Sequence, residues 1–389
     1  MFIDIEKIKI YRNYLNKQNH QGIEQKKVLT TFLHELAYKK NVILDAPVIV
    51  GLIVTDKCNL NCPHCFSNNC GSLDATTDEI KRVIDQIVDV GVISLYLTGG
   101  EPFMRTDLEE IIAYIKKKRL FLTIHTNALL LNRERVKKIS QLLNKEEDVI
   151  QISIDGSTLD ISNKMRTLNS KQFDRFKRNC ELLSEFSVPT KINVTVTNHN
   201  VQDLVNIYQY AAKIKAKQIA FSTLFEINTN DGDTYLPSSK ELMYSFCDVL
   251  EEAKKMKNPV QIIQDPIAVP CGVSELQQIF NENKEETPWY FCPAGTLAIE
   301  IDTNGNVFPC PFLRSENFNA GNINEQSLSL IWKSGKGWES FRDRYLRGYE
   351  GCSGCSFSDS CRGACAAQAY HKGMTMYDPD PRCDVIINR

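Results

Sequence analysis

The sequence predicts an α/β protein in which six β/α units form a partial parallel barrel, followed by a cysteine-rich C-terminal domain. Two observations carry this prediction. Between Val48 and Leu224, apolar β-branched runs alternate with helical patterns of about three turns, an order typical of a parallel sheet covered by helices. Beyond residue 290 the chain contains seven of its 14 cysteines. Clustered thiols of this kind indicate metal binding or catalysis.

Six runs are expected to be strands, because each is apolar or alternating and ends in a polar or small tip. They are Val48–Thr55, Val92–Thr98, Leu120–Ala128, Val149–Ser157, Lys191–Asn200 and Ala216–Leu224. Helices are expected between them at Asp78–Val90, Asp107–Lys118, Arg135–Leu143 and Tyr208–Lys215. The carboxyl ends of parallel barrel strands meet at one mouth, where active sites lie.

Composition excludes several classes of protein. The 389 residues are 42% hydrophobic and 24% charged, which suits a large globular core. A formal charge of −2 and scattered lysines predict no nucleic-acid partner. No apolar run approaches the roughly 20 residues that span a bilayer, and the start of the chain lacks the features of a secretory signal. We therefore expect a cytoplasmic protein with no membrane partner. Its four expected regions are an N-terminal helical extension (1–47), the barrel (48–235), a helical bridge (236–290) and the cysteine-rich domain (291–389).

The first cysteine group follows the first expected strand. Cys58, Cys62 and Cys65 form a C-x3-C-x2-C loop. In a reducing compartment these thiols are not expected to pair as disulfides. Three thiolates can hold a metal–sulfur cube and leave one iron open, whereas a closed zinc site requires four ligands. The alternatives are a zinc knuckle with Cys70 or His64 as its fourth ligand, or core cysteines.

This loop, the GGEP stretch at Gly99–Pro102 and the six β/α units resemble the radical S-adenosylmethionine (SAM) enzymes. The resemblance implies a partial (β/α)6 TIM barrel and a [4Fe-4S] cluster held by Cys58, Cys62 and Cys65. It also implies that the open iron binds the amino and carboxylate groups of SAM. One electron from the cluster then cleaves SAM to a 5′-deoxyadenosyl radical.

By position in the family's motifs, further residues are expected to contact SAM. The turn that meets the amino group consists of Gly99, Gly100, Glu101 and Pro102. Ser153 and Asp155 lie on the fourth strand, and Arg166 is expected to pair with the carboxylate. His64 either lies beside the adenine or is an ordinary polar loop residue. Asn127 and Asn193 fall at strand tips, where they either face the mouth or cap loops.

The second cysteine group lies in the last hundred residues. An Asn304-Gly305 dipeptide predicts a hairpin that ends at Cys310. The full set is Cys292, Cys310, Cys352, Cys355, Cys361, Cys365 and Cys383. A four-thiolate zinc site would leave three of these cysteines over.

This order of cysteines resembles the SPASM extension of peptide-modifying radical SAM enzymes, and the resemblance implies two auxiliary [4Fe-4S] clusters. The outer cluster would be held by Cys352, Cys355, Cys361 and Cys383, and the inner one by Cys292, Cys310 and Cys365. Cys271 is either the fourth inner ligand, or that iron is open. Cys70, Cys180 and Cys247 fit no motif, and the latter two are expected to be small buried hydrophobic residues in helices.

The substrate is less constrained by the sequence. Sulfatase maturases have an acid directly after the cysteine that closes the hairpin, but this chain has Pro311 there. The 47 residues before the first strand are too few for a fused leader-binding domain. Two candidate substrates remain. One is a precursor peptide delivered by a separate leader-binding protein, because the length and the LDAP lead-in are similar to those of mycofactocin maturases. The other is a tetrapyrrole, as in SPASM enzymes of alternative haem synthesis.

The peptide is favoured because the acidic loop Thr223–Ser239 suits a peptide groove. Tetrapyrrole carboxylates would need arginines, for which Arg314, Arg342, Arg344, Arg347 and Arg362 are available. The expected reductant is a flavodoxin or ferredoxin. A zinc-stabilised binding scaffold is the non-enzyme alternative.

Overall fold

The protein forms one ten-stranded sheet. The structure is a computed structural model that describes residues 43–66, 74–225, 235–264, 292–347, 352 and 362–383. The strands follow the order β10-β9-β8-β1-β2-β3-β4-β5-β6-β7. Their bounds are β1 Ile49–Thr55, β2 Ser94–Gly99, β3 Phe121–Thr126, β4 Val149–Ser153, β5 Thr190–Val196, β6 Gln218–Thr223, β7 Gln261–Gln264, β8 Ala298–Ile301, β9 Asn306–Phe308 and β10 Gly321–Asn322. Neighbours from β1 to β7 pair in parallel, and β8 pairs in parallel with the other edge of β1.

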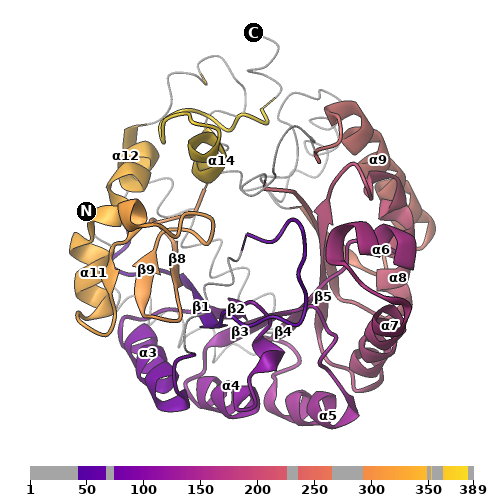
Figure 1. Cartoon of the computed structure of the whole chain (residues 1–389), viewed down its shortest axis with the longest axis horizontal. Coiled ribbons are helices and arrows are strands. Elements are labelled where there is room, and N and C mark those ends of the chain that lie inside the picture. The colour runs from indigo at the N-terminus through magenta and orange to yellow at the C-terminus, as the bar shows by residue number, and fades with distance from the viewer. Residues whose placement is uncertain are drawn as a thin grey trace.

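Helices form an outer layer around the strands, in an arc from α3 to α9 (Figure 1). Their bounds are α3 Thr77–Asp89, α4 Leu108–Lys117, α5 Arg133–Leu142, α6 Leu159–Arg166, α7 Ser170–Glu185, α8 Leu204–Lys213, α9 Ser239–Lys255, α11 Leu328–Ser334, α12 Glu339–Arg347 and α14 Ala366–His371. Short 3-10 turns occur at Pro102–Met104, Val201–Asp203, Glu316–Phe318 and Lys336–Trp338. Helix α3 illustrates how the sequence specifies these helices. A capping box between Thr76 and Glu79 starts it, and four apolar side chains along one face are buried.

Alternation along the strands separates two faces of the sheet. Val50, Leu52 and Val54 of β1 lie in the same core cluster as Ile80 and Ile84 of α3, so this face packs against the helices. Successive strand residues point to opposite faces. The inner face of the sheet therefore carries the intervening residues of each strand, and these are largely polar: Tyr96, His125, Gln151, Ser153, Asn193, Gln218, Gln261 and Glu300.

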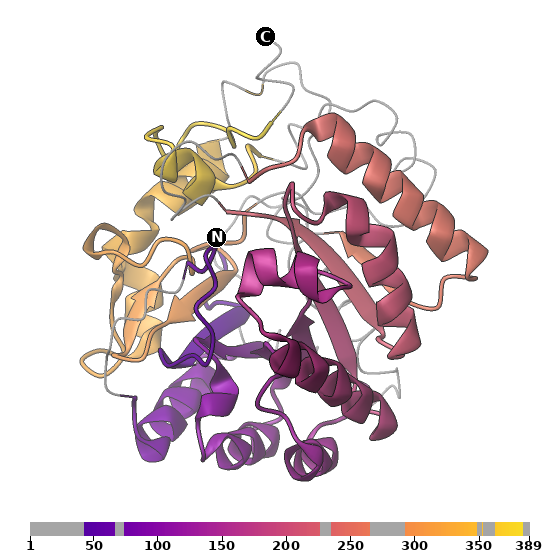
Figure 2. The same ribbon diagram turned by 45° about the vertical axis from the view of Figure 1, so that its right-hand side comes forward.

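The C-terminal domain continues the barrel sheet instead of hanging beside it. Strands β8 and β9 form the antiparallel hairpin predicted from Asn304-Gly305, and Gly305 has the positive φ of +85° that its turn requires. Leu297 O accepts hydrogen bonds from the amides of Val48 and Ile49 at the start of β1. Trp332 of α11 is buried and donates to Leu44 O at 2.8 Å. Both views place this hairpin next to β1 and the segment containing α14 above it (Figures 1 and 2).

The six predicted strands are confirmed, each within its predicted range or one residue beyond it. Two pairings were not predicted: β7 lies within the region expected to be a helical bridge, and β8 joins β1. Cys180 is buried on α7 and Cys247 is half-buried on α9, as expected for small apolar residues. The extension over 1–42, the acidic stretch 226–234 and the bridge beyond 264 lie outside the described residues. Within the described part of the chain, no helix combines the length and apolarity needed to cross a membrane.

Candidate functional site

The first cysteine loop leaves the carboxyl end of β1 and is held on two sides. On one side, the amides of Gly100 and Glu101 donate to Thr55 O and Lys57 O at 2.9 and 2.8 Å. On the other side, Thr303 of the C-terminal hairpin donates through Oγ1 to Asp56 Oδ2 at 2.8 Å. The backbone that leads into Cys58 is therefore fixed by both domains. No sequence pattern predicted the contact with Thr303.

The two glycines of the GGEP turn are required by this close approach. A Cβ on Gly100 would lie 2.3 Å from Lys57 O, and one on Gly99 would lie 2.1 Å from Thr55 O. Gly99 also has a φ of +139°, a region that side chains rarely adopt. Any side chain at either position would push the turn away from the cysteine loop.

The Glu101 side chain is buried and bonded within the protein. It is 1% exposed, and its Oε1 accepts hydrogen bonds from Thr126 Oγ1 and the Phe103 amide, while Oε2 accepts one from the Asn127 amide. Burial raises the pKa of this carboxyl, and these three donors oppose the rise. The carboxylate thus joins the GGEP turn to the end of β3 and does not face the mouth.

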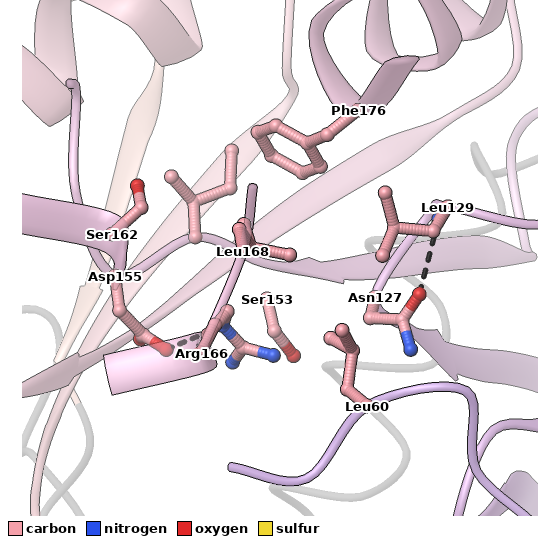
Figure 3. Close-up of a pocket in the computed structure, with 10 residues that line it drawn as sticks. Leu60, Asn127, Leu129, Ser153, Asp155, Ser162, Arg166, Leu168 and Phe176 are labelled. Atoms are coloured by element: carbon pink, nitrogen blue, oxygen red, sulfur yellow. Dashed lines mark hydrogen bonds and ion pairs between the residues drawn. The ribbon is translucent and has the colours of Figure 1, made fainter. Parts of the chain in front are cut away.

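A pocket lies at the carboxyl ends of β3 and β4, lined by several of the predicted SAM contacts (Figure 3). Its empty volume, including space open to solvent, is about 270 Å³. Asp155 Oδ2 accepts from Arg166 Nε at 2.6 Å, and Asp155 Oδ1 accepts from the Thr195 amide at 2.9 Å. Figure 3 shows the Arg166 guanidinium extending from Asp155 towards Ser153. Asp155 therefore positions Arg166 at the pocket.

His64 and Asn127 also reach this region. His64 Nε2 lies 4.0 Å from Asp155 Oδ2, and burial lowers the pKa of its imidazole. Its Nδ1 is buried with no hydrogen-bond partner among the described residues. Asn127 Oδ1 accepts from the Leu129 amide, which is the loop cap considered above, and its Nδ2 donates to Asn59 of the cysteine loop at 2.8 Å. Asn193 pairs with Ser153 in the sheet and lies on its inner face.

The three thiols of the first group lie near enough to interact electrostatically. Burial raises the pKa of Cys62 to about 11 and also raises that of Cys58, and the charges of neighbouring thiols add to both shifts. Arg166 opposes the shift of Cys62. Across the described part of the chain, no three His, Cys, Asp or Glu side chains are placed to hold a single metal ion.

Three cysteines of the second group also come together. Cys292, Cys310 and Cys365 pack in one apolar cluster with Phe312 and Met376. Burial raises the pKa of all three thiols, and the charge of Cys292 adds to the shifts of the other two. Backbone amides point at the sulfurs, and the Phe312 amide donates to Cys310 Sγ at 3.4 Å. Such donors to sulfur are a feature of iron–sulfur sites.

The other cysteines are only partly described. Cys352 and Cys383 are both half-buried. Cys355, Cys361, Cys271 and Cys70 lie outside the described residues.

An aromatic contact joins the two cysteine sites. The ring of Phe66, directly after Cys65, lies 4.6 Å from the ring of Phe312, measured between centroids. Phe312 in turn stacks on Phe225 with centroids 3.8 Å apart. The loop of the first thiol group and the loop of the second therefore touch.

The comparisons with known proteins agree with this geometry. Residues 52–211 match the radical SAM superfamily, and residues 292–356 match SPASM, an iron-sulfur cluster-binding domain. The chain belongs to the radical SAM enzymes with a SPASM domain. Such an enzyme uses a [4Fe-4S] cluster, SAM and auxiliary iron–sulfur clusters.

Two curated relatives span most of this radical SAM/SPASM chain. An AdoMet-dependent heme synthase of Methanosarcina barkeri is 29% identical over 359 residues, which cover 87% of this chain and 97% of the relative. The mycofactocin maturase MftC of Mycolicibacterium smegmatis is 26% identical over 347 residues, covering 87% and 83%.

Solved structures share the fold. Streptococcus suis SuiB bound to the precursor peptide SuiA has a TM-score of 0.73 and 19% identity, covering 92% of this chain and 81% of that one. The enzyme anSMEcpe with bound AdoMet has a TM-score of 0.67 and 19% identity, covering 86% and 90%.

Proposed function

We propose that this enzyme oxidatively modifies or cross-links a ribosomally made peptide. When bound, the cluster and SAM supply a 5′-deoxyadenosyl radical that abstracts hydrogen from the substrate. The observation that supports the proposal is the contact between Phe66 and Phe312, because these residues follow Cys65 and Cys310, which we assign to the SAM-binding and the inner auxiliary cluster. A substrate held there can lose a hydrogen atom on one side and an electron on the other. A maturase relative and the fold shared with SuiB support a peptide as that substrate.

We assign the site residues as follows. Cys58, Cys62 and Cys65 hold the SAM-binding cluster, since these three cysteines lie in the segment that matches the radical SAM superfamily and three thiolates leave one iron open. Arg166, fixed by Asp155, binds the SAM carboxylate, and Ser153 lines the same pocket. Backbone carbonyls of the Gly99–Pro102 turn are the candidates for the SAM amino group, because the Glu101 carboxylate is buried and already accepts three hydrogen bonds within the protein. His64 lies at the edge of this site.

We assign the remaining cysteines to the two auxiliary clusters. Cys292, Cys310 and Cys365 hold the inner cluster, with Cys271 or a substrate group as a fourth ligand. The outer cluster takes Cys352, Cys355, Cys361 and Cys383. As partners we propose a separate leader-binding protein for the precursor peptide and a flavodoxin or ferredoxin as the reductant. We place the enzyme in the cytoplasm.

A tetrapyrrole is the second candidate substrate, because the heme synthase relative matches over nearly its whole length. Two of the five candidate arginines argue against it. Arg344 is 2% exposed and donates to Met376 O and Gly363 O, and Arg342 donates to Gly295 O and Trp332 O while it covers the Trp332 ring. Both guanidinium groups are occupied by backbone carbonyls and are not available for carboxylates.

The test is the intact mass of the precursor peptide encoded beside this gene, co-expressed anaerobically with the enzyme and any neighbouring leader-binding protein. Loss of two hydrogens indicates a cross-link, and additional loss of carbon dioxide indicates oxidative decarboxylation. The Cys58→Ala variant is the control and should leave the mass unchanged. An unchanged peptide with the wild-type enzyme, together with turnover of a carboxylated iron porphyrin, would reject the peptide in favour of the tetrapyrrole.

A further inference from the structure

A buried carboxyl group on the inner face of the sheet has no place in the site described so far. Glu300 of β8 is 0% exposed, and its Oε2 accepts a hydrogen bond from Tyr96 Oη at 2.5 Å. Its other oxygen, Oε1, is buried and has no hydrogen-bond partner among the described residues. A buried polar atom left unpaired costs stability, so its presence in a strand core calls for a reason.

The backbone is shaped to let Glu300 and Tyr96 meet. Both residues stand opposite Gly51 in the sheet, one on each side of β1. A Cβ on Gly51 would lie 1.9 Å from Glu300 Oε2 and 2.3 Å from Tyr96 Cζ. Because Gly51 has no side chain, it leaves the space in which Glu300 and Tyr96 touch. Their contact therefore links β8 and β2 across β1.

Charged and titratable groups surround the Glu300 carboxyl on each neighbouring element. Tyr96 comes from β2 and stacks on His125 of β3 with ring centroids 5.1 Å apart. The loop after β9 supplies Arg314 and the Cys310 thiol, whose raised pKa includes a contribution from the charge of Glu300. Burial raises the pKa of Glu300 to about 7, against the opposing effects of Tyr96 and Arg314. Burial therefore favours the protonated carboxyl, so that Glu300 holds a proton to a higher pH than an exposed glutamate does.

The placement of Glu300 suits a reaction that removes a proton. Cys310 carries one of the inner auxiliary thiols, and Pro311 after it has no titratable group. Among the groups named above, Glu300 alone combines complete burial, an unpaired oxygen and a position on the inner face of the sheet.

We propose that Glu300 Oε1 accepts the proton that the substrate loses during its oxidation, with Tyr96 as the positioning residue. The proposal rests on the proposed function, and it accounts for the proton that the oxidation of the substrate releases. The radical takes one hydrogen atom from a substrate carbon. As the new bond to a heteroatom or ring forms, the X–H or C–H bond of the partner atom breaks. Its proton goes to Glu300, and the remaining electron would be taken up by an auxiliary iron–sulfur cluster held by Cys292, Cys310 and Cys365. Together these steps make a two-electron oxidation.

The test uses the reconstituted holoenzyme and the Glu300→Gln variant, which keeps the size and polarity of the side chain. Without any substrate, infrared difference spectra should show a protonated carboxyl band that titrates between pH 6 and 8 and is absent from the variant. A band that does not titrate in this range overturns the proposal, whatever the substrate is.

With a precursor peptide deuterated at the reacting carbon, Glu300→Gln should still transfer deuterium into 5′-deoxyadenosine but lose product formation by about 100-fold. Wild-type rates of product, or loss of the deuterium transfer itself, would overturn the assignment, the latter by showing a structural role. Tyr96→Phe keeps the ring and removes the hydrogen bond, so the pH profile of product formation should shift to higher pH. A peptide that wild-type enzyme leaves unmodified would count against the proposed function, while the infrared band still decides the role of Glu300.

Discussion

The hydroxyl of Thr303 donates to the carboxylate of Asp56 across the boundary between the two domains, and both side chains are buried. Asp56 lies two residues before Cys58, so a residue of the C-terminal hairpin helps to fix the loop of the first cysteine group. Replacing Thr303 by Val removes the donor and leaves a buried carboxylate with one partner fewer, which should destabilise the protein by about 1–3 kcal/mol. The variant should also lose iron faster under chelator challenge. Thr303→Ser keeps the donor and should behave as wild type.

Gly100→Ala should impair cluster assembly, because its Cβ would collide with the Lys57 carbonyl, 2.3 Å away. We expect lower iron content after reconstitution and little 5′-deoxyadenosine. Gly373→Ala is the matched control: it carries the strain of a positive φ of +75°, roughly 1–2 kcal/mol, but its Cβ meets nothing within 4 Å. Equal iron content in both variants would contradict the role of the close approach.

Arg166→Gln should weaken SAM binding by about 10-fold or more, since a charge-assisted bond contributes roughly 1.5–3 kcal/mol. Asp155→Asn should weaken SAM binding less, because it keeps the Arg166 guanidinium but removes the charged partner that fixes its position. Equilibrium binding of SAM to reconstituted protein measures both. Arg133→Gln breaks an exposed ion pair with Glu185 and should leave SAM affinity unchanged. Normal affinity in Arg166→Gln would remove this residue from the site.

Single substitutions should separate the two cysteine sites by their products. Cys58→Ala and Cys365→Ala should each lower the iron content by about four atoms per chain, the content of one cube. Cys58→Ala should abolish 5′-deoxyadenosine, whereas Cys365→Ala should retain SAM cleavage and lose the modified product. Iron analysis and chromatography of 5′-deoxyadenosine distinguish these patterns. Two zinc ions and no iron in the wild-type protein would rule out the radical mechanism.

The raised pKa of Glu300 predicts a pH dependence of stability. The folded chain binds this proton with a pKa of about 7, against 4.5 ordinarily. The contribution of the protonated Glu300 carboxyl to the free energy of unfolding is therefore complete below about pH 4.5 and is lost as pH rises through 7. The shift corresponds to about 3 kcal/mol. Unfolding temperatures at pH 6 and 8 should therefore differ more in wild type than in Glu300→Gln. Identical differences in both proteins would contradict a buried titrating carboxyl.

The first six strands and the helices predicted between them follow from local pattern alone, since β1 is an apolar run and strands such as β3, β4 and β5 alternate buried apolar residues with more polar ones. The parallel pairing of β8 with β1 joins residues some 250 positions apart, and no local pattern encodes it. The short β7 lies in a stretch whose preceding helix dominates the sequence signal.

The candidate site divides in the same way. The resemblance to SPASM domains implied that Cys292, Cys310 and Cys365 share a site, and the structure packs these three residues in one apolar cluster. The sequence did not predict that the Glu101 carboxylate turns inward, since side-chain direction depends on donors from β3. Glu300 was missed, although an acid between two isoleucines in the AIEI strand was a visible signal of a buried charge.

The place of β8 in the sheet has a consequence for how this molecule can be divided. Without residues 292–347, the backbone amides and carbonyls of β1 that now pair with β8 would form a bare sheet edge. Such an edge invites pairing with other chains. We therefore expect the barrel without this segment to be more prone to self-association than the full chain, because β8 covers the β1 edge.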